Sequence, residues 1–290
     1  VKAAGTHIGD WLVVNGLPYI IRGMGYGLRK PKHNIPGTEI SGVVETVGRS
    51  VAGFNPGDEV FGWVEGGGFA EFVSVPQESL ATKPANLTFE QAAVVPISAF
   101  AALEALRDKA DIQVGQKVLI IGASGGVGSY AVQIAKALGA EVTGVASTRN
   151  LDMVRSLGAD HVIDYTTTDF AQNRNAYDVI IDTAGNSSLR RIRRALTPKG
   201  TLVIVGGSGG RWLMGAGRSA RAGLLSLFIG QNLVAFVSKP SQEKLIALRA
   251  LIEAEDVTPV IDRTYALADA PTALTYVGER HTSGKTVITI

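Results

Sequence analysis

Residues 117–139 read Lys117-Val-Leu-Ile-Ile-Gly-Ala-Ser-Gly-Gly-Val-Gly-Ser-Tyr-Ala-Val-Gln-Ile-Ala-Lys-Ala-Leu-Gly139. The first five form an apolar run without polar alternation, which is typical of a parallel strand buried on both faces. A glycine-rich segment follows directly, and the apolar residues after it repeat with helical spacing up to Gly139, a common helix-ending residue. Residues 141–146 are predicted to form a second short strand. This order of strand, glycine turn, helix and strand predicts a βαβ unit that binds a dinucleotide.

The small residues of the glycine turn have separate physical roles in such a unit. Ala123 stands where the fingerprint usually has its first glycine. Gly125 lets the backbone approach a pyrophosphate, and Gly128 lets the helix pack closely on the strand. Free amides at the helix N-terminus then hold the phosphates. The alternative is an ordinary glycine-rich turn, which the flanking strand and helix disfavour. The predicted phosphate contacts are Ser124, Gly125, Gly126, Val127 and Gly128.

The segment after the second strand indicates which nucleotide the site prefers. An acid there holds the ribose 2′-OH of NAD, whereas an arginine accommodates the 2′-phosphate of NADP. Ser147, Thr148 and Arg149 follow the strand, and no carboxylate lies between Glu141 and Asp152. The two hydroxyls can donate to a 2′-phosphate, and the guanidinium can pair with it. The pattern predicts NADP(H) as cofactor; the alternative is a polar loop with a solvated arginine.

Composition narrows the class of protein. A length of 290 residues predicts two domains, and a net charge of +2 is too small to favour nucleic acid or an anionic membrane as partner. The chain has no cysteine, which excludes disulfides and thiolate metal sites and fits a cytoplasmic location. No apolar run reaches the roughly 18 residues of a membrane span, and no secretory signal is visible. The densest basic run, residues 190–194, predicts a solvated helix face.

The remaining pattern predicts an α/β protein built from a β domain and a doubly wound parallel sheet. Residues 1–98 are glycine-rich, with strand-like runs at 43–47 and 71–75, and Thr88 followed by Gln91 forms a capping box. Helical segments separate the strands of the second domain. Its six predicted strands are residues 117–121, 141–146, 161–163, 177–182, 200–205 and 233–237.

The last part of the chain returns to strand-rich sequence. Residues 259–290 alternate strand, helix and strand, and we expect them to rejoin the first domain. The predicted domains are therefore residues 1–98, 99–258 and 259–290, the middle one binding the nucleotide. Residues 223–237 are the most apolar stretch, which predicts a buried helix followed by a strand.

Several motifs together resemble a known family. They are Pro36-Gly-Thr-Glu-Ile-Ser-Gly-Val-Val-Glu-Thr-Val-Gly48, Phe54-Asn-Pro-Gly-Asp-Glu-Val-Phe61, Gly122–Gly128, Gly158-Ala-Asp160 with Asp164-Tyr165, and Gly284-Lys285. On these residues the chain resembles the zinc-independent branch of the medium-chain dehydrogenase/reductase superfamily, the quinone oxidoreductase-like proteins. The resemblance implies a GroES-like β domain and a Rossmann domain, with the active site in the cleft between them. It also implies a homodimer joined through residues 233–237.

The resemblance implies further site residues. Tyr165 matches a tyrosine near the adenosine phosphate, with a core tyrosine as the alternative. Residues 212–214 match a loop that lines the substrate mouth, with a core role as the alternative, and Lys285 is expected to reach the cofactor or to snorkel from an edge strand. The residues implied beside the nicotinamide and its ribose are Ala184, Gly185, Gly206 and Gly207.

Metal ligands are missing where zinc-dependent relatives have them. Thr38 occupies the usual histidine position, and His7 stands where the first cysteine would be. One imidazole without further neighbouring ligands cannot fill a tetrahedral zinc shell, so we expect no metal. Without a Lewis acid, the implied reaction is direct hydride transfer from NADPH to a quinone or an activated enone, a small hydrophobic substrate.

The role of His7 and the activity itself stay open at this stage. Relatives often have asparagine at this position. The histidine could donate a hydrogen bond or a proton to a developing oxyanion, or it could be purely structural. Relatives also begin some thirty residues earlier, so we expect either a fragment or a naturally short β domain. The alternative functions are an enoyl-thioester reductase and an NADPH-binding sensor or scaffold without catalysis.

Overall fold

The computed structural model describes residues 1–19, 22–23, 27, 31–206 and 215–290, which form two compact units. Unit 1 combines Val1–Phe100 with Lys239–Ile290, and unit 2 is Ala101–Ser238. Unit 2, which contains the predicted nucleotide-binding region, is thus inserted within the chain of unit 1. The sequence-based boundary at residue 258 needs correction, because α8 (Gln242–Glu253) packs on β4 (Leu80–Thr82) of unit 1. No helix in the described part of the chain combines the length and apolarity that a membrane crossing requires.

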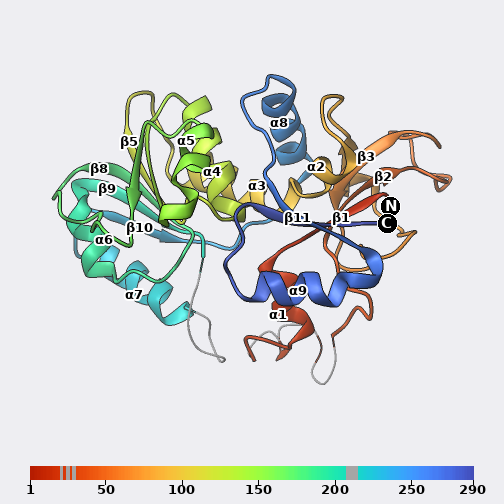
Figure 1. Ribbon diagram of the computed structural model, residues 1–290, viewed down its shortest axis with the longest axis horizontal. Helices are drawn as coiled ribbons and strands as arrows, with labels where there is room; N and C mark the ends of the chain where they lie inside the picture. The colour runs from red at the N-terminus through yellow and green to blue at the C-terminus, as the bar shows by residue number, and fades with distance from the viewer. Residues whose placement is uncertain (20–21, 24–26, 28–30, 207–214) are drawn as a thin grey trace. The chain divides into compact units, whose positions relative to one another are not determined.

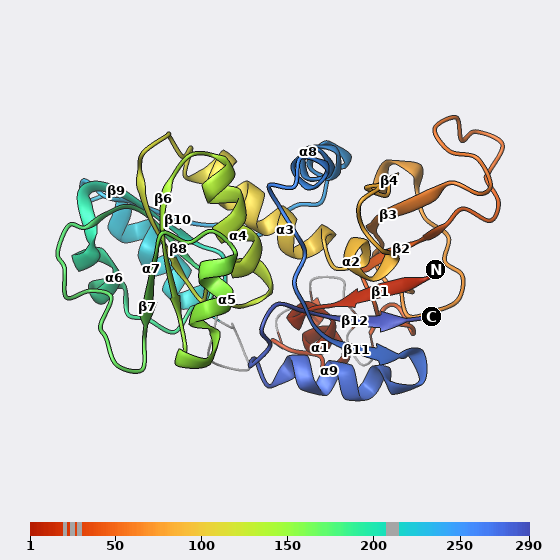
Figure 2. The same cartoon turned by 45° about the horizontal axis from the view of Figure 1, so that its top comes forward.

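Unit 2 is a six-stranded parallel sheet in the order β10-β9-β8-β5-β6-β7. Helices α4 and α5 cover one face, and α6 and α7 cover the other (Figures 1 and 2). The strands are Lys117–Ile121 (β5), Glu141–Ala146 (β6), His161–Asp164 (β7), Tyr177–Asp182 (β8), Leu196–Ile204 (β9) and Asn232–Ala235 (β10). The helices are Gly126–Ala137 (α4), Leu151–Ser156 (α5), Leu189–Ala195 (α6) and Ala216–Ser226 (α7).

The core of unit 2 explains why its strands read as continuous apolar runs. Leu119, Ile180 and Leu202 lie on three neighbouring strands and are fully buried, together with Ile192 of α6. All six strands predicted from the sequence are present, although β9 begins four residues earlier than expected. The doubly wound parallel sheet, and with it the α/β fold class, is confirmed.

The apolar stretch at residues 223–237 does not form the buried helix that the sequence predicted. Ala222 is the only buried residue of α7, and Leu224, Leu227 and Phe228 at or just after its end are 62%, 78% and 78% exposed. The strand that follows, β10, lies at the edge of the sheet. Several apolar side chains of this stretch therefore lie on the surface of unit 2 and not in its interior.

Unit 1 contains a second six-stranded sheet, in the order β11-β12-β1-β2-β3-β4. Its neighbours are antiparallel except for β11 and β12. The strands besides β4 are Ala3–Thr6 (β1), Glu39–Val43 (β2), Glu59–Trp63 (β3), Ile261–Ala266 (β11) and Lys285–Thr289 (β12). The helices besides α8 are Ile8–Val14 (α1), Phe89–Ala93 (α2), Pro96–Leu103 (α3, whose end reaches unit 2) and Ala270–Gly278 (α9).

Two strand predictions for unit 1 were wrong. The run at 43–47 forms no strand beyond Val43, because the β2 ladder pairs the preceding residues 39–43 with β3. Residues 71–75 have no ladder partner in the described structure, although Val73 packs on the core and Phe72 is 71% exposed. The alternation of half-buried and exposed side chains at residues 72–75 resembles that of a strand, although no ladder forms there. The capping box of Thr88 is confirmed, since its hydroxyl accepts from the amide of Gln91.

Candidate functional site

The glycine turn after β5 is shaped by close backbone contacts. Gly122 has a φ of +83°, and a Cβ on Gly128 would lie 2.0 Å from the carbonyl oxygen of Gly122. Any side chain on Gly128 would therefore push α4 away from the strand. A Cβ on Gly125, by contrast, would meet only the Gly122 oxygen at 3.4 Å. Packing thus requires glycine at 128 and leaves open space at 125, where the fingerprint places a pyrophosphate.

The N-terminus of α4 presents unsatisfied donors. The cap residue is Gly125, and no side chain caps the helix. The first amides of a helix have no carbonyl partner within it, so those of Gly126, Val127 and Gly128 are available to an anion. The hydroxyl of Ser124 accepts a hydrogen bond of 3.1 Å from the side-chain amide of Asn150. This bond ties the glycine turn to the segment after β6, a link that the sequence analysis missed.

A carboxylate whose place beside the predicted 2′-phosphate segment the sequence analysis missed is that of Asp164. In the β6–β7 ladder Ala146 is paired with Asp164, so the end of β7 lies beside the end of β6. The hydroxyl of Thr148 donates to Asp164 Oδ2 at 2.5 Å, and this bond is the main reason that the pKa of Asp164 is lowered. Ser147 is half-buried and Arg149 is exposed. The segment therefore combines a cation with a neighbouring anion.

The remaining predicted cofactor residues lie at the carboxyl ends of the same sheet. Tyr165 follows β7, donates its amide to the carbonyl of Ala146, and is 59% exposed, which excludes the core role. Residues 184–185 form the turn after β8. A Cβ on Gly206, just after β9, would lie 2.2 Å from the carbonyl oxygen of Thr183, so these two turns are in contact. Gly207 and residues 212–214 lie outside the described residues.

His7 belongs to a hydrogen-bonded chain in unit 1. Its Nδ1 accepts from the amide of Gly9 at 2.9 Å and thereby caps α1. The proton of a neutral ring is then on Nε2, which lies 2.6 Å from the hydroxyl of Thr38. That hydroxyl donates to Asp10 Oδ1 at 3.1 Å. The direction of donation therefore runs from His7 through Thr38 to Asp10.

Burial governs the protonation of this chain. The side chain of Asp10 is 1% exposed and that of His7 is 19% exposed. Burial lowers the pKa of His7 to about 4 and raises the pKa of Asp10 to about 6, because each charged form loses hydration. At neutral pH His7 is thus uncharged. It can donate a hydrogen bond through Nε2, but an imidazolium is not available as an acid.

A buried ion pair lies beside the chain. Lys285 Nζ donates to Glu39 Oε1, and both side chains are almost fully buried, so the expectation that Lys285 snorkels from an edge strand was wrong. Glu39 Oε2 also accepts from the amide of Ile97 at 3.1 Å. A Cβ on Gly5 would lie 2.6 Å from Glu39 Oε1, so glycine is needed there to admit the carboxylate.

The donors around His7 do not fit a tetrahedral zinc ion. Both ring nitrogens already have partners, and the neighbouring Thr38 hydroxyl is not a typical zinc ligand. Among the residues that the structure describes, no group of three or more His, Asp or Glu side chains is arranged to hold a metal.

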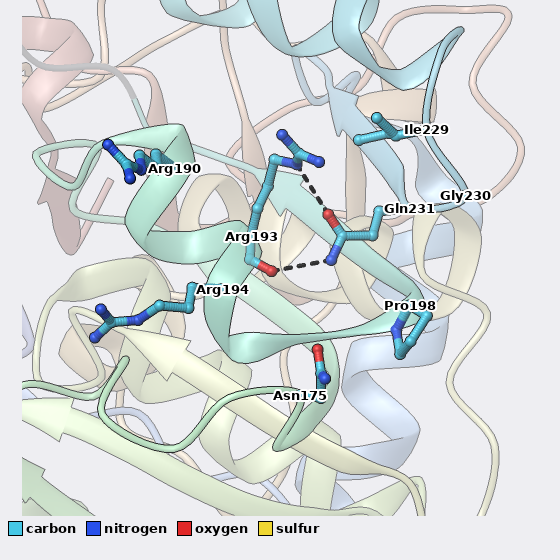
Figure 3. A pocket seen from close by; sticks show the side chains of 8 residues that line it. All are labelled: Asn175, Arg190, Arg193, Arg194, Pro198, Ile229, Gly230 and Gln231. Carbon is cyan, nitrogen blue, oxygen red and sulfur yellow. Dashed lines mark hydrogen bonds between the residues drawn. The ribbon is translucent and has the colours of Figure 1, made fainter.

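Unit 2 also has a basic hollow of about 430 Å³, shown in Figure 3. Its residues come from α6 and from the amino-terminal ends of strands, so it lies at the opposite edge of the sheet from the glycine turn. Arg193 Nε donates to Gln231, which returns a bond to the Arg193 carbonyl (Figure 3). Arg190 and Arg194 are exposed, as predicted for a solvated helix face. The hollow is not part of the predicted cofactor site.

Two segments of the chain match known protein families. Residues 1–85 match the family described as alcohol dehydrogenase GroES-like domain, and residues 157–288 match one described as zinc-binding dehydrogenase. The second match does not include positions 7 and 38, where zinc ligands were sought. The solved structures that align over 100% of the chain include the quinone oxidoreductase from Coxiella burnetii (TM-score 0.84, 26% identity, 89% of that chain) and CurK enoyl reductase (TM-score 0.84, 25% identity, 89% of that chain).

Curated relatives include oxidoreductases of plants. The chain is 31% identical to a chloroplast envelope quinone oxidoreductase homolog of Arabidopsis thaliana, over 88% of the chain and 79% of that protein. It is 30% identical to 2-methylene-furan-3-one reductase of Solanum lycopersicum and 32% identical to NADPH-dependent alkenal/one oxidoreductase of Arabidopsis thaliana, spanning 89% of itself but only 64% of each of these proteins. The chain belongs to the quinone oxidoreductase-like branch of the medium-chain dehydrogenase/reductase superfamily.

Proposed function

We propose that this protein is an NADPH-dependent reductase of quinones or activated enones that works by direct hydride transfer without zinc. The observation that carries the proposal is the uncapped N-terminus of α4 behind a turn with open space at Gly125. The names of relatives that act on quinones, alkenals and enones support the substrate class.

The cofactor is held by residues from five strand ends. The amides of residues 126–128 and Ser124 receive the pyrophosphate, and Arg149 pairs with the 2′-phosphate together with Ser147. Thr148 contributes its hydroxyl, which also forms a hydrogen bond with Asp164. When bound, the nicotinamide supplies the hydride, and the protein contributes orientation and exclusion of water. The turn at 184–185, Gly206 and the exposed Tyr165 complete the described part of the site.

His7 contributes as a neutral donor. Its Nε2 proton, which points to the Thr38 hydroxyl in this structure, can stabilise an oxyanion that develops on the substrate by a hydrogen bond, without transfer of the proton. Quinones and activated enones need little further polarisation, which suits a site whose donors do not fit zinc.

A second candidate is an enoyl-thioester reductase. It is favoured by the similarity to CurK enoyl reductase, which extends over the whole chain. The chemistry would be the same hydride addition to an electron-poor carbon, with a thioester in place of the ketone. Turnover of a crotonyl thioester that exceeds turnover of any quinone would favour this candidate.

The test is NADPH oxidation by the purified protein with a panel of quinones, enones and enoyl thioesters. Sustained turnover with quinones or enones is the expected result. Tight NADPH binding without turnover of any substrate would support the sensor hypothesis instead. Two variants test the role of His7. We expect His7→Asn, which retains a hydrogen-bond donor, to keep more activity than His7→Ala. Equal activity of the wild type and both variants would remove His7 from the mechanism.

We further propose that two copies associate through β10. This strand ends the order of the sheet and has no further strand partner among the described residues. Leu227 and Phe228, exposed at 78% each, follow α7, the helix that packs on β10. Sedimentation should find a dimer that Phe228→Glu weakens; a monomeric wild type would contradict this. The cytoplasmic location stays a prediction, and the names of some relatives refer to chloroplasts.

A further inference from the structure

One asparagine of unit 2 stands at a helix cap but is used differently. Asn150 is the N-cap residue of α5, and its side chain makes no capping hydrogen bond to that helix. Asparagine is preferred at such positions because its side-chain oxygen accepts from the first amides of the helix. In this structure the side-chain amide of Asn150 donates to Ser124 Oγ in the glycine turn, at 3.1 Å. Asn150 is only 8% exposed, so the bond is largely shielded from water.

This bond determines what the Ser124 hydroxyl can do. A serine hydroxyl has one proton to donate and two lone pairs that accept. Asn150 donates to one of the lone pairs, so the proton points away from Asn150. Among the residues that the structure describes, none accepts this proton. Ser124 is half-buried and not sealed within the unit, so the proton is available to a bound ligand.

The space next to Ser124 suits an anionic ligand. A Cβ on the neighbouring Gly125 would meet only the Gly122 carbonyl oxygen, at 3.4 Å, so a ligand can approach the backbone closely there. The first amides of α4 follow, and no side chain caps them. In dinucleotide-binding folds such a turn receives the pyrophosphate. A phosphate oxygen held by these amides is an acceptor, which is the kind of partner that the Ser124 proton lacks.

We propose that Asn150 is a positioning residue of the cofactor site: it holds the Ser124 hydroxyl so that its proton is donated to a pyrophosphate oxygen of NADPH. The inference rests on the proposed function and adds to it a residue that acts through Ser124 without touching the reacting atoms. When the Asn150 amide is removed, the hydroxyl turns freely and its proton is divided between the phosphate and water.

The experiment measures the affinities of two ligands by fluorescence titration, NADPH directly and adenosine 2′-monophosphate by competition. The second ligand has the 2′-phosphate but no pyrophosphate, so it reports on the segment that contains Arg149. The variants are Ser124→Ala, Asn150→Ala and the double variant. Asn86→Ala is the matched control, because the side-chain amide of Asn86 also joins two segments, by a bond of 2.8 Å to the carbonyl of Ile252 in unit 1. Thermal unfolding checks the fold of each protein.

We expect NADPH to bind about tenfold more weakly to Ser124→Ala and about fivefold more weakly to Asn150→Ala, since a hydrogen bond to a charged acceptor is lost or misdirected. The double variant should bind NADPH within about twofold of Ser124→Ala, because Asn150 acts through that hydroxyl. The affinity for adenosine 2′-monophosphate should stay within about twofold of the wild type in every variant. Asn86→Ala should bind both ligands as the wild type does.

Additive losses in the double variant, or equal losses of the two ligands in Asn150→Ala, would show that Asn150 only supports the local fold and would overturn the inference. Unchanged NADPH affinity of Ser124→Ala or of Asn150→Ala would also overturn it. These outcomes leave the proposed function standing, whereas a wild type that does not bind NADPH would overturn both.

A second variant covers the case in which Asn150→Ala does not fold. Asn150→Asp has nearly the same shape, but its carboxylate accepts the Ser124 proton and so withdraws it from the phosphate. We expect this variant to bind NADPH more weakly than the wild type, with a smaller loss when Ser124→Ala is already present. A loss of the same size with and without the Ser124 hydroxyl would report only the added charge and would overturn the inference.

Discussion

The glycine turn of unit 2 and the buried polar cluster of unit 1 are both candidate functional regions, but they are built in opposite ways. The turn is one contiguous segment whose backbone contacts follow from residue spacing. The cluster is defined here as His7, Asp10, Thr38, Glu39 and Lys285. Its members lie on or next to the ends of β1, β2 and β12 or in α1, and they are brought together by ladders that pair Gly5 with Glu39 and Thr6 with Thr286. The comparison teaches that the turn depends on small residues, whereas the cluster depends on charges that must remain paired.

The largest expected effect is on the cluster. Lys285→Met leaves Glu39 buried without its cation, which should lower the free energy of unfolding by about 4 kcal/mol. The matched control is Arg249→Met on α8, whose partner Glu253 is partly exposed, and there we expect a loss within about 0.5 kcal/mol. Urea unfolding measures the free energy of unfolding of both variants and of the wild type. Similar losses for the two variants would contradict the buried pair as a structural element.

Two glycines of the turn should respond differently to the same substitution. Gly128→Ala forces a Cβ against a backbone carbonyl and should cost about 3 kcal/mol of stability. Gly125→Ala has room for its Cβ, so we expect stability within about 1 kcal/mol of the wild type and weakened NADPH binding. Unfolding and binding are measured on both proteins. Unchanged binding by a folded Gly125→Ala protein would show that no phosphate approaches position 125.

The cluster also makes a pH-dependent prediction. His7, with its pKa lowered to about 4, loses stabilisation as the pH falls below 6.5, whereas Asp10, with its pKa raised to about 6, gains stabilisation as the pH falls from 6 to about 4. The two opposing slopes offset each other in the wild type. Asp10→Asn removes the stabilisation that Asp10 provides as the pH falls. The free energy of unfolding of this variant, relative to that of the wild type, should therefore fall by about 2 kcal/mol between pH 7 and pH 4. Parallel pH curves of the two proteins would contradict the raised pKa of Asp10.

A smaller effect is expected at the nucleotide segment. Asp164→Asn keeps an acceptor for Thr148 but removes a negative charge near the predicted 2′-phosphate, so NADPH should gain about threefold over NADH at low salt. Asp160→Asn, whose carboxylate instead pairs with Lys136, is the control and should leave the ratio unchanged. A ratio that stays constant in Asp164→Asn would place the 2′-phosphate elsewhere.

Much of unit 2 could be predicted because its signals are local. The central strands β5, β6 and β8 are almost fully buried and read as apolar runs, and the turn after β5 shows its constraint in consecutive glycines. Asp164 was missed because its nearness to Thr148 depends on which strands are neighbours. The exposed end of α7 was missed because apolarity does not tell a surface from an interior. In unit 1, the pairing of Lys285 with Glu39 depends on strand pairings across nearly the whole chain.

The most direct test of the account is a titration of the wild type and of Arg149→Ala with NADPH and with NADH. We predict that the wild type binds NADPH at least tenfold more tightly than NADH, and that Arg149→Ala loses most of this preference while its affinity for NADH is retained. Equal affinities of the wild type for the two cofactors, or equal losses of both in Arg149→Ala, would contradict the assignment of the 2′-phosphate to the segment after β6.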